Sequence, residues 1–288
     1  MQFLDVKTDY AFKKVFGSSA SKEILISFLN SILYLNESNI ISDLTIVDPY
    51  NIPMIKGVKD TFVDVKAVLN DGSKVIIEMQ VLNHKGFEKR VLYNAAKNYS
   101  IQLTKNENYH LLNPVIALSI VDFTMFEGSS VTSRFKLLEK EKFIHYSDDI
   151  ELVFVELPKF NKTIDELTNI EEQWIYFLKN AGTLDYIPKT FDQSIQQALD
   201  VANEANMTFD ELEAQHKRKE FIYIHKSSIE LAEDNGFERG MNRGIEKGIE
   251  KGIEKVAINM LKEKIDSNTI ASTTGLTEQT IDQLKKKI

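Results

Sequence analysis

Residues 61–80 have the sequence TFVDVKAVLNDGSKVIIEMQ, in which two runs rich in β-branched residues flank Asn70-Asp71-Gly72. A short polar turn with glycine, placed between two such runs, is typical of a β-hairpin. We therefore predict strands over Thr61–Leu69 and Lys74–Val81. In a three-residue loop, Gly72 would take the positive φ that other residues avoid.

Two carboxylates meet in this predicted hairpin. A three-residue loop pairs Leu69 with Ser73. Counting back along both strands then places Asp64 opposite Glu78. Opposed Cβ atoms lie about 4.5–5.5 Å apart, so two like charges there are destabilising. Glu78 also interrupts the apolar run Val75–Ile77, where an unpaired carboxylate is costly to bury. A divalent cation removes both problems, because Mg²⁺ prefers one or two carboxylates plus water. A solvated acidic face is the alternative.

Apolar residues at helical or alternating spacing predict the other elements of the core. In chain order these are helices Tyr10–Phe16 and Lys22–Leu33, strand Ile40–Val47, the hairpin, helix Phe87–Leu103, and strands Val115–Val121 and Ile150–Leu157. We therefore expect residues 1–160 to form an α/β core in the order αβββαβ, with a mixed sheet flanked by helices. Residues 161–235 are helical in pattern and acidic, and we expect them to begin an α-helical C-terminal extension.

Glycine recurs at every fourth position from Gly236 to Gly252. Each glycine inside a helix costs roughly 0.8–1.0 kcal/mol relative to alanine, so this stretch should not form a stable helix alone. Ile245, Ile249 and Ile253 form a ridge beside the glycines, along which two copies of the chain could pair. Residues 236–255 are therefore either a pairing helix or a partly flexible linker.

The last segment, residues 256–288, resembles a helix-turn-helix. Gly275 would lie in the turn, Thr277 would cap the second helix, and apolar residues recur on one face. Short helices also pack in this way without contacting DNA, so DNA binding by this segment is one of two interpretations.

Several short motifs follow one another along the chain. They are Lys7-x-Asp9-x-x-Phe12-Lys13-x-x-Phe16-Gly17, Phe28-Leu29-Asn30-x-Ile32-Leu33, Ile77-Glu78-Met79-Gln80, Phe87-x-x-Arg90-x-x-Tyr93 and Glu156-Leu157-Pro158-Lys159-Phe160. In this order they resemble the PD-(D/E)XK nuclease superfamily, in its recombination-promoting nuclease (Rpn) and transposase-associated branch. The resemblance covers about residues 1–180, with the glycine-repeat tail as an accessory.

The resemblance implies which residues would form a catalytic site. Asp64 and Glu78 take the positions of the metal ligands, with the backbone carbonyl of Met79 as a third ligand, for Mg²⁺ or Mn²⁺. Gln80 stands where the superfamily usually has a lysine, although glutamine is familiar in the Rpn branch. An amide can orient the attacking water but cannot accept its proton. Activation of the water would then rest on the metal, which lowers the pKa of a bound water.

Three further residues are candidates for the site. Asp9, on the first helix, would be a further catalytic acid near the metal, or else a cap of that helix following Thr8. Arg90 would bind a substrate phosphate with its guanidinium fork, or else pair with a nearby Glu. Lys13 is a weaker candidate for phosphate binding.

Composition excludes some classes of function. Cysteine is absent, which rules out disulfides and thiolate metal sites. No apolar run reaches the roughly 18 residues of a membrane helix, and the N-terminus lacks a secretory signal, so we expect a cytoplasmic protein. The net charge of −8 does not exclude DNA, because residues 1–110 carry 13 Lys and Arg against 12 Asp and Glu.

Taken with the resemblance, these observations predict a Mg²⁺-dependent DNA endonuclease that acts as a homodimer in recombination, mobile-element movement or defence. Two alternatives stay open. One is a degenerate core that binds nucleic acid without cutting it, which Gln80 favours. The other is an interaction protein governed through its glycine repeat.

Overall fold

The computed structural model describes residues 1–33, 40–51 and 61–286 of the chain. These residues divide into two compact units, 1–223 and 224–288. Helix α6 (Phe209–Lys262) contributes its first turns to the first unit. Among the described residues, no helix combines the length and the apolar character that crossing a membrane requires.

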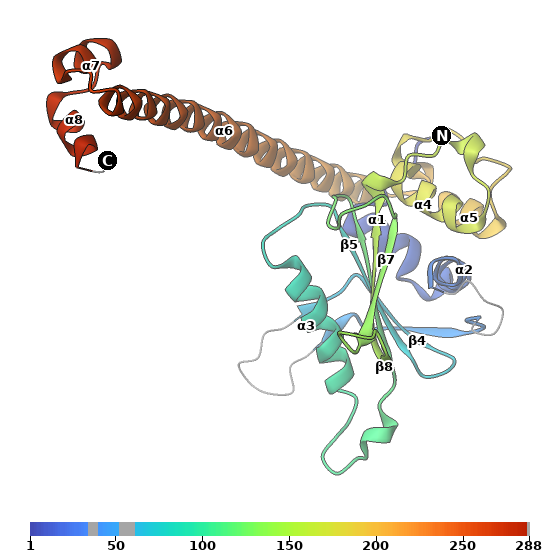
Figure 1. The fold of residues 1–288 in the computed structure, drawn as a ribbon. Helices are drawn as coiled ribbons and strands as arrows, with labels where there is room; N and C mark the ends of the chain where they lie inside the picture. The colour runs from blue at the N-terminus through green and yellow to red at the C-terminus, as the bar shows by residue number, and fades with distance from the viewer. Residues whose placement is uncertain (34–39, 52–60, 287–288) are drawn as a thin grey trace. The chain divides into compact units, whose positions relative to one another are not determined.

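A six-stranded sheet forms the centre of the first unit (Figure 1). Its strands are β1 (Leu44–Val47), β4 (Val65–Leu69), β5 (Lys74–Gln80), β6 (Val115–Val121), β7 (Thr132–Leu138) and β8 (His145–Glu156). Their spatial order is β1-β4-β5-β6-β8-β7. The central strands β5, β6 and β8 run parallel, whereas β1, β4 and β7 pair antiparallel with their neighbours. The predicted mixed sheet is confirmed.

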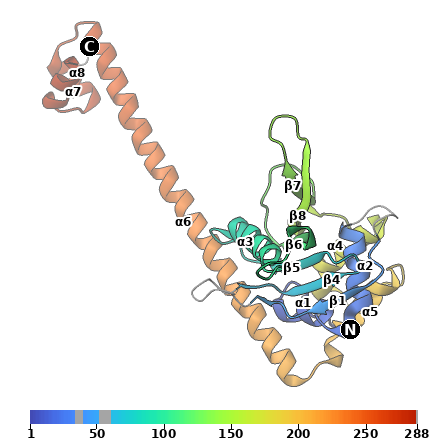
Figure 2. The same ribbon diagram turned by 90° about the horizontal axis from the view of Figure 1, so that it is seen from below.

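Helices cover both faces of this sheet (Figures 1 and 2). One face carries α3 (Phe87–Ser100), and the other carries α1 (Asp9–Phe16), α2 (Lys22–Leu33), α4 (Ile170–Asn180) and α5 (Gln193–Val201). Short 3₁₀ helices connect the elements at Ser19–Ser21, Tyr109–Leu111, Leu157–Lys159, Ile164–Glu166, Ala181–Thr183 and Glu204–Asn206.

The larger core lies between the sheet and α1, α2, α4 and α5. Trp174 of α4 is completely buried, with its ring centroid 5.8 Å from that of Phe16 and 5.5 Å from that of Phe28. Aromatic pairs at this spacing add about 0.5–1.5 kcal/mol each beyond the burial of their area. The helices after residue 160 therefore share one core with the helices before the hairpin.

The predicted strand Thr61–Leu69 is interrupted. Its first two residues form β3 (Thr61–Phe62), which pairs with β2 (Tyr50–Asn51) in a separate two-stranded sheet. Regular pairing with β5 begins only at Val65. Asp64 therefore lies at the point where the chain enters the main sheet.

Strand β7 is absent from the prediction. Most of its side chains are exposed, because β7 is an edge strand and buries little apolar surface. Its partner β8 also begins earlier than predicted, at His145, since its first half extends beyond the core with β7. Conversely, β1 begins at Leu44 and α3 ends at Ser100, which makes both shorter than predicted.

The second unit contains the rest of α6, with α7 (Ser267–Thr274) and α8 (Glu278–Lys285). Gly275 ends α7 with a φ of 72°, and Thr277 caps α8 by accepting a hydrogen bond from the Thr280 N–H. The helix-turn-helix geometry is thus as predicted. The glycine repeat is helical throughout. Apart from its chain neighbours and the nearby backbone of the same helix, a Cβ on any of these glycines would meet no atom of the described residues within 4 Å.

Candidate functional site

The hairpin has the predicted register. The Leu69 N–H donates to the Ser73 carbonyl at 2.8 Å, and Gly72 has a φ of 87°. Val65 pairs with Ile77, and this is the last regular pair. The Asp64 N–H also bonds to the Ile77 carbonyl, so Asp64 and Glu78 are neighbours at the end of the ladder and not a regular opposed pair. The turn sequence predicted the register of the regular part of the hairpin, and the two acids lie close enough for the charge of Asp64 to raise the pKa of Glu78.

Asp64 takes over part of the backbone ladder where β4 is interrupted. Its N–H donates to the Ile77 carbonyl at 3.0 Å, and its Oδ2 accepts the Met79 N–H at 2.8 Å. In an extended strand the N–H and the C=O of one residue point to the same side. The Met79 carbonyl is therefore directed toward the same edge of β5 as the Asp64 carboxylate.

Each of the two acids is contacted by its own basic side chain, and the two basic side chains come from different helices. Lys13 of α1 lies 3.4 Å from Asp64, and Arg90 of α3 pairs with Glu78. Both carboxylate side chains are only 14% exposed. Arg90 is thus paired with a nearby Glu, as one of its two interpretations required, while phosphate binding by Arg90 and Lys13 stays a prediction.

The two acids have raised pKa values. Burial raises the pKa of Glu78 to about 7; the Arg90 charge opposes this rise and the Asp64 charge adds to it. Burial also raises the pKa of Asp64, against the Met79 N–H bond and the charge of Lys13. The two cations therefore compensate this pair of carboxylates incompletely, and a further positive charge would favour the ionised forms.

Gln80 is held at both ends of its amide. Its Oε1 accepts from Arg90 at 2.7 Å, and its Nε2 donates to the Leu82 carbonyl at 2.7 Å. Arg90 also lies 3.0 Å from the His84 ring. Arg90 therefore links Gln80 to Glu78, a contact that the sequence prediction did not include.

Asp9 is the first residue of α1, and the cap of this helix is Thr8, whose Oγ1 accepts the Ala11 N–H. The capping alternative for Asp9 is therefore wrong. Its Oδ1 lies 2.9 Å from Nε of Arg218, on the first turns of α6. The charge of Asp9 contributes to the raised pKa of Asp64, so Asp9 acts electrostatically on this one acid.

Among the described residues, no group of three or more His, Asp or Glu side chains is arranged to hold a metal ion. Two carboxylates and a backbone carbonyl nevertheless suit Mg²⁺ or Mn²⁺, because Mg²⁺ usually keeps several waters beside one or two carboxylates. The donor set of Asp64, Glu78 and the Met79 carbonyl fits such an ion.

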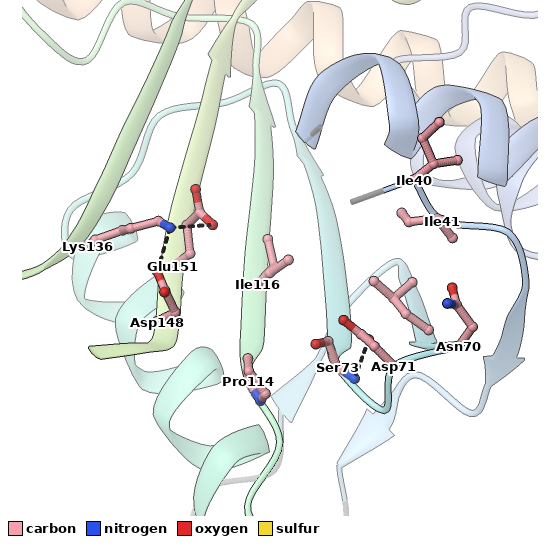
Figure 3. A pocket seen from close by; sticks show the side chains of 11 residues that line it. Ile40, Ile41, Asn70, Asp71, Ser73, Pro114, Ile116, Lys136, Asp148 and Glu151 are labelled. Carbon is pink, nitrogen blue, oxygen red and sulfur yellow. Dashed lines mark hydrogen bonds and ion pairs between the residues drawn. The ribbon is translucent and has the colours of Figure 1, made fainter. Parts of the chain in front are cut away.

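A pocket of about 370 Å³ lies away from Asp64 and Glu78, near the start of β5 and β6 (Figure 3). Its lining residue Ile116 belongs to the core on the α2 side of the sheet, whereas Glu78 lies on the α3 side with Ile76. The Lys136 ammonium lies 2.6 Å from Asp148 and 3.8 Å from Glu151. This pocket contains none of the predicted site residues.

Two family models match the chain. One is described as PD-(D/E)XK nuclease family transposase and matches residues 6–232. The other is described as the Rpn/YhgA-like nuclease family C-terminal HTH domain and matches residues 251–286. No curated protein and no solved structure matches the chain.

Proposed function

Because the chain belongs to the PD-(D/E)XK nuclease family transposases, we propose that it is a Mg²⁺- or Mn²⁺-dependent endonuclease that hydrolyses DNA phosphodiester bonds. The observation that carries the proposal is the pair Asp64 and Glu78. Both are mostly buried, they interact electrostatically at the end of one hairpin, and the pKa of Glu78 is about 7. Such a pair, buried at a structural cost, is typical of a functional site.

In this proposal Asp64, Glu78 and the Met79 carbonyl hold the ion. When bound, the ion lowers the pKa of its water and stabilises the charge that develops on the phosphate. Gln80 lies on the strand face of Glu78 and offers a hydrogen bond that orients the water. Asp9 adds negative charge beside the ligands, which favours cation binding.

Arg90 and Lys13 would change partners during substrate binding. In the free protein each neutralises part of the charge on one acid. A bound divalent cation would supply that positive charge and repel both side chains. They would then turn to phosphate oxygens, for which the planar fork of Arg90 is suited.

The second unit would position the enzyme on DNA. Its helix-turn-helix lies in the segment that matches the C-terminal HTH family model. We further propose a homodimer that pairs along the glycine repeat, where Ile245 and Ile249 are more than half exposed. The cellular context would be recombination, mobile-element movement or defence, in the cytoplasm.

One observation favours a second function, nucleic-acid binding without cleavage. Gln80 replaces the usual lysine, and both ends of its amide are already bonded to Arg90 and Leu82. If Gln80 cannot leave these partners, the water would lack its orienting group.

A plasmid-nicking assay separates the two functions. Wild-type protein should nick DNA with Mg²⁺ or Mn²⁺ and stop in EDTA, while Asp64→Asn and Glu78→Gln should abolish cutting. Asp71→Asn is the matched control, because it replaces a carboxylate of the same hairpin and keeps the oxygen that accepts the Ser73 N–H at 2.9 Å. Cutting at the wild-type rate by either site variant would exclude the proposed site. DNA binding without cutting would instead support the second function. Single-stranded DNA and RNA, run in parallel, would define the substrate.

A further inference from the structure

A small cavity is lined by Glu78 together with residues of β5, β6 and α3. Figure 2 shows α3 next to β5 and β6. The cavity has a volume of about 10 Å³, which is about the room that one water molecule needs. Its polar lining consists of Glu78, Asn94 and Ser119, and the remaining lining residues are chiefly apolar. The cavity is thus large enough, and polar enough, for a single water.

Asn94 has the strongest need for a partner in this cavity. It is 1% exposed, and its Oδ1 has no hydrogen-bond partner among the described residues. Buried side-chain oxygens are nearly always hydrogen-bonded, to protein or to an ordered water. Asn94 also follows Arg90 by four residues on α3, so both side chains project from one face of the helix.

Ser119 completes the cavity from the neighbouring strand. It is 2% exposed, and its Cα pairs with that of Glu78 in the parallel register of β5 and β6. Residues paired in this way project from the same face of the sheet. A water in the cavity would therefore meet three polar groups, which is the usual number for a buried water.

We propose that Asn94 is a positioning residue for Glu78 and acts through one buried water shared with Ser119. The water donates one hydrogen to the Glu78 carboxylate and the other to the Asn94 Oδ1, and it accepts the Ser119 hydroxyl. Together with Arg90, it fixes the carboxylate from behind. This inference rests on the proposed function, because its consequence is that Glu78 is aligned to bind a cation. Groups that orient a metal ligand in this way typically change metal affinity by 10–100-fold when removed.

The test measures Mn²⁺ affinity of the full chain by calorimetry, without substrate. Asn94→Ala should weaken Mn²⁺ binding about tenfold, and Asn94→Ser, which restores a hydroxyl, should recover part of it. Asn98→Ala is the matched control, since Asn98 is also a fully buried asparagine of α3 with an unpartnered Oδ1 but does not line the cavity. Its Mn²⁺ affinity should equal that of the wild type, even if its melting temperature falls as much as that of Asn94→Ala.

Wild-type affinity in Asn94→Ala, or an equal loss in Asn98→Ala, would overturn the proposal. If Asn94→Ala does not fold, Ser119→Ala tests the same water from the strand side and should also weaken binding. Glu78→Gln separates this inference from the proposed function. If the wild type binds Mn²⁺ no better than Glu78→Gln, the metal site itself is wrong and the inference falls with it. If Glu78→Gln loses binding while both cavity variants keep it, only the role of Asn94 is excluded.

Discussion

Replacing Glu78 by glutamine should stabilise the metal-free protein, and this effect should depend on pH. The pKa of Glu78 rises from 4.5 to about 7 on folding because of burial. Each pH unit between these two pKa values lowers the free energy of unfolding by about 1.4 kcal/mol. Above pH 7 the folded protein therefore bears a cost of about 3 kcal/mol for holding this carboxylate ionised.

The sign follows from proton binding. Between pH 4.5 and 7 the folded state holds a proton on Glu78 that the unfolded state has lost, so stability falls as the pH rises. Glu78→Gln removes this loss of stability, because glutamine does not ionise. We expect the variant to be more stable than the wild type by about 3 kcal/mol at pH 8, and by less than about 1 kcal/mol at pH 5. Saturating Mg²⁺ should narrow the difference at pH 8, because a ligand that binds only the folded wild type stabilises it.

Urea denaturation in EDTA, followed by tryptophan fluorescence, measures this difference. Trp174 is the single tryptophan of the chain and is fully buried in the core of the first unit, so it reports on the unit that holds Glu78. Asp71→Asn is the control, and its effect should not change between pH 5 and pH 8 in the way that Glu78→Gln does. A Glu78→Gln variant that is no more stable than the wild type at pH 8, or equally stabilised at both pH values, would refute the reasoning.

Three further predictions concern the site and its supports. Gln80→Lys should keep or increase the cleavage rate, whereas Gln80→Leu should lose most of it, since leucine cannot orient water. Equal cleavage rates for wild type and Gln80→Leu across a Mg²⁺ titration would show that Gln80 has no role in catalysis. Arg90→Lys keeps the charge but loses the fork, so the KM for DNA should rise severalfold, and an unchanged KM would argue against phosphate binding. A chain ending at residue 235 should fold and cut DNA. A chain ending at residue 208 should melt at a lower temperature, because it loses the 2.7 Å hydrogen bond between Thr8 and the buried Gln215. Equal melting temperatures of the two truncated chains would show that α6 does not support α1.

The sequence was sufficient to predict the hairpin and the register of its regular part, but not the break in pairing at Asp64. Asn70-Asp71-Gly72 determines the loop, and alternation along the strands then determines which side chains are paired. The buried strand Val115–Val121 was also predicted with its exact bounds, because an unbroken apolar run of that length is typical of a strand that is buried on both faces.

Contacts between charged groups far apart in the chain were not predictable. Lys13 of α1 forms an ion pair with Asp64, and Asp9 forms one with Arg218 of α6. Such pairs form wherever packing brings two surfaces together, and they leave no periodic pattern in the sequence. The edge strand β7 was missed for a related reason, since its exposed side chains need no apolar alternation.

The interruption of β4 is the feature that makes a third oxygen ligand available. In a continuous hairpin, the strand opposite Met79 would occupy both its N–H and its carbonyl. Here regular pairing with β5 stops at Val65 and Ile77, and the Asp64 carboxylate takes the Met79 N–H instead. The Met79 carbonyl, on the same edge, then has no partner residue in β4. The break therefore places a carboxylate and a backbone carbonyl side by side, next to Glu78, and a regular strand of the same composition would supply only the two opposed acids.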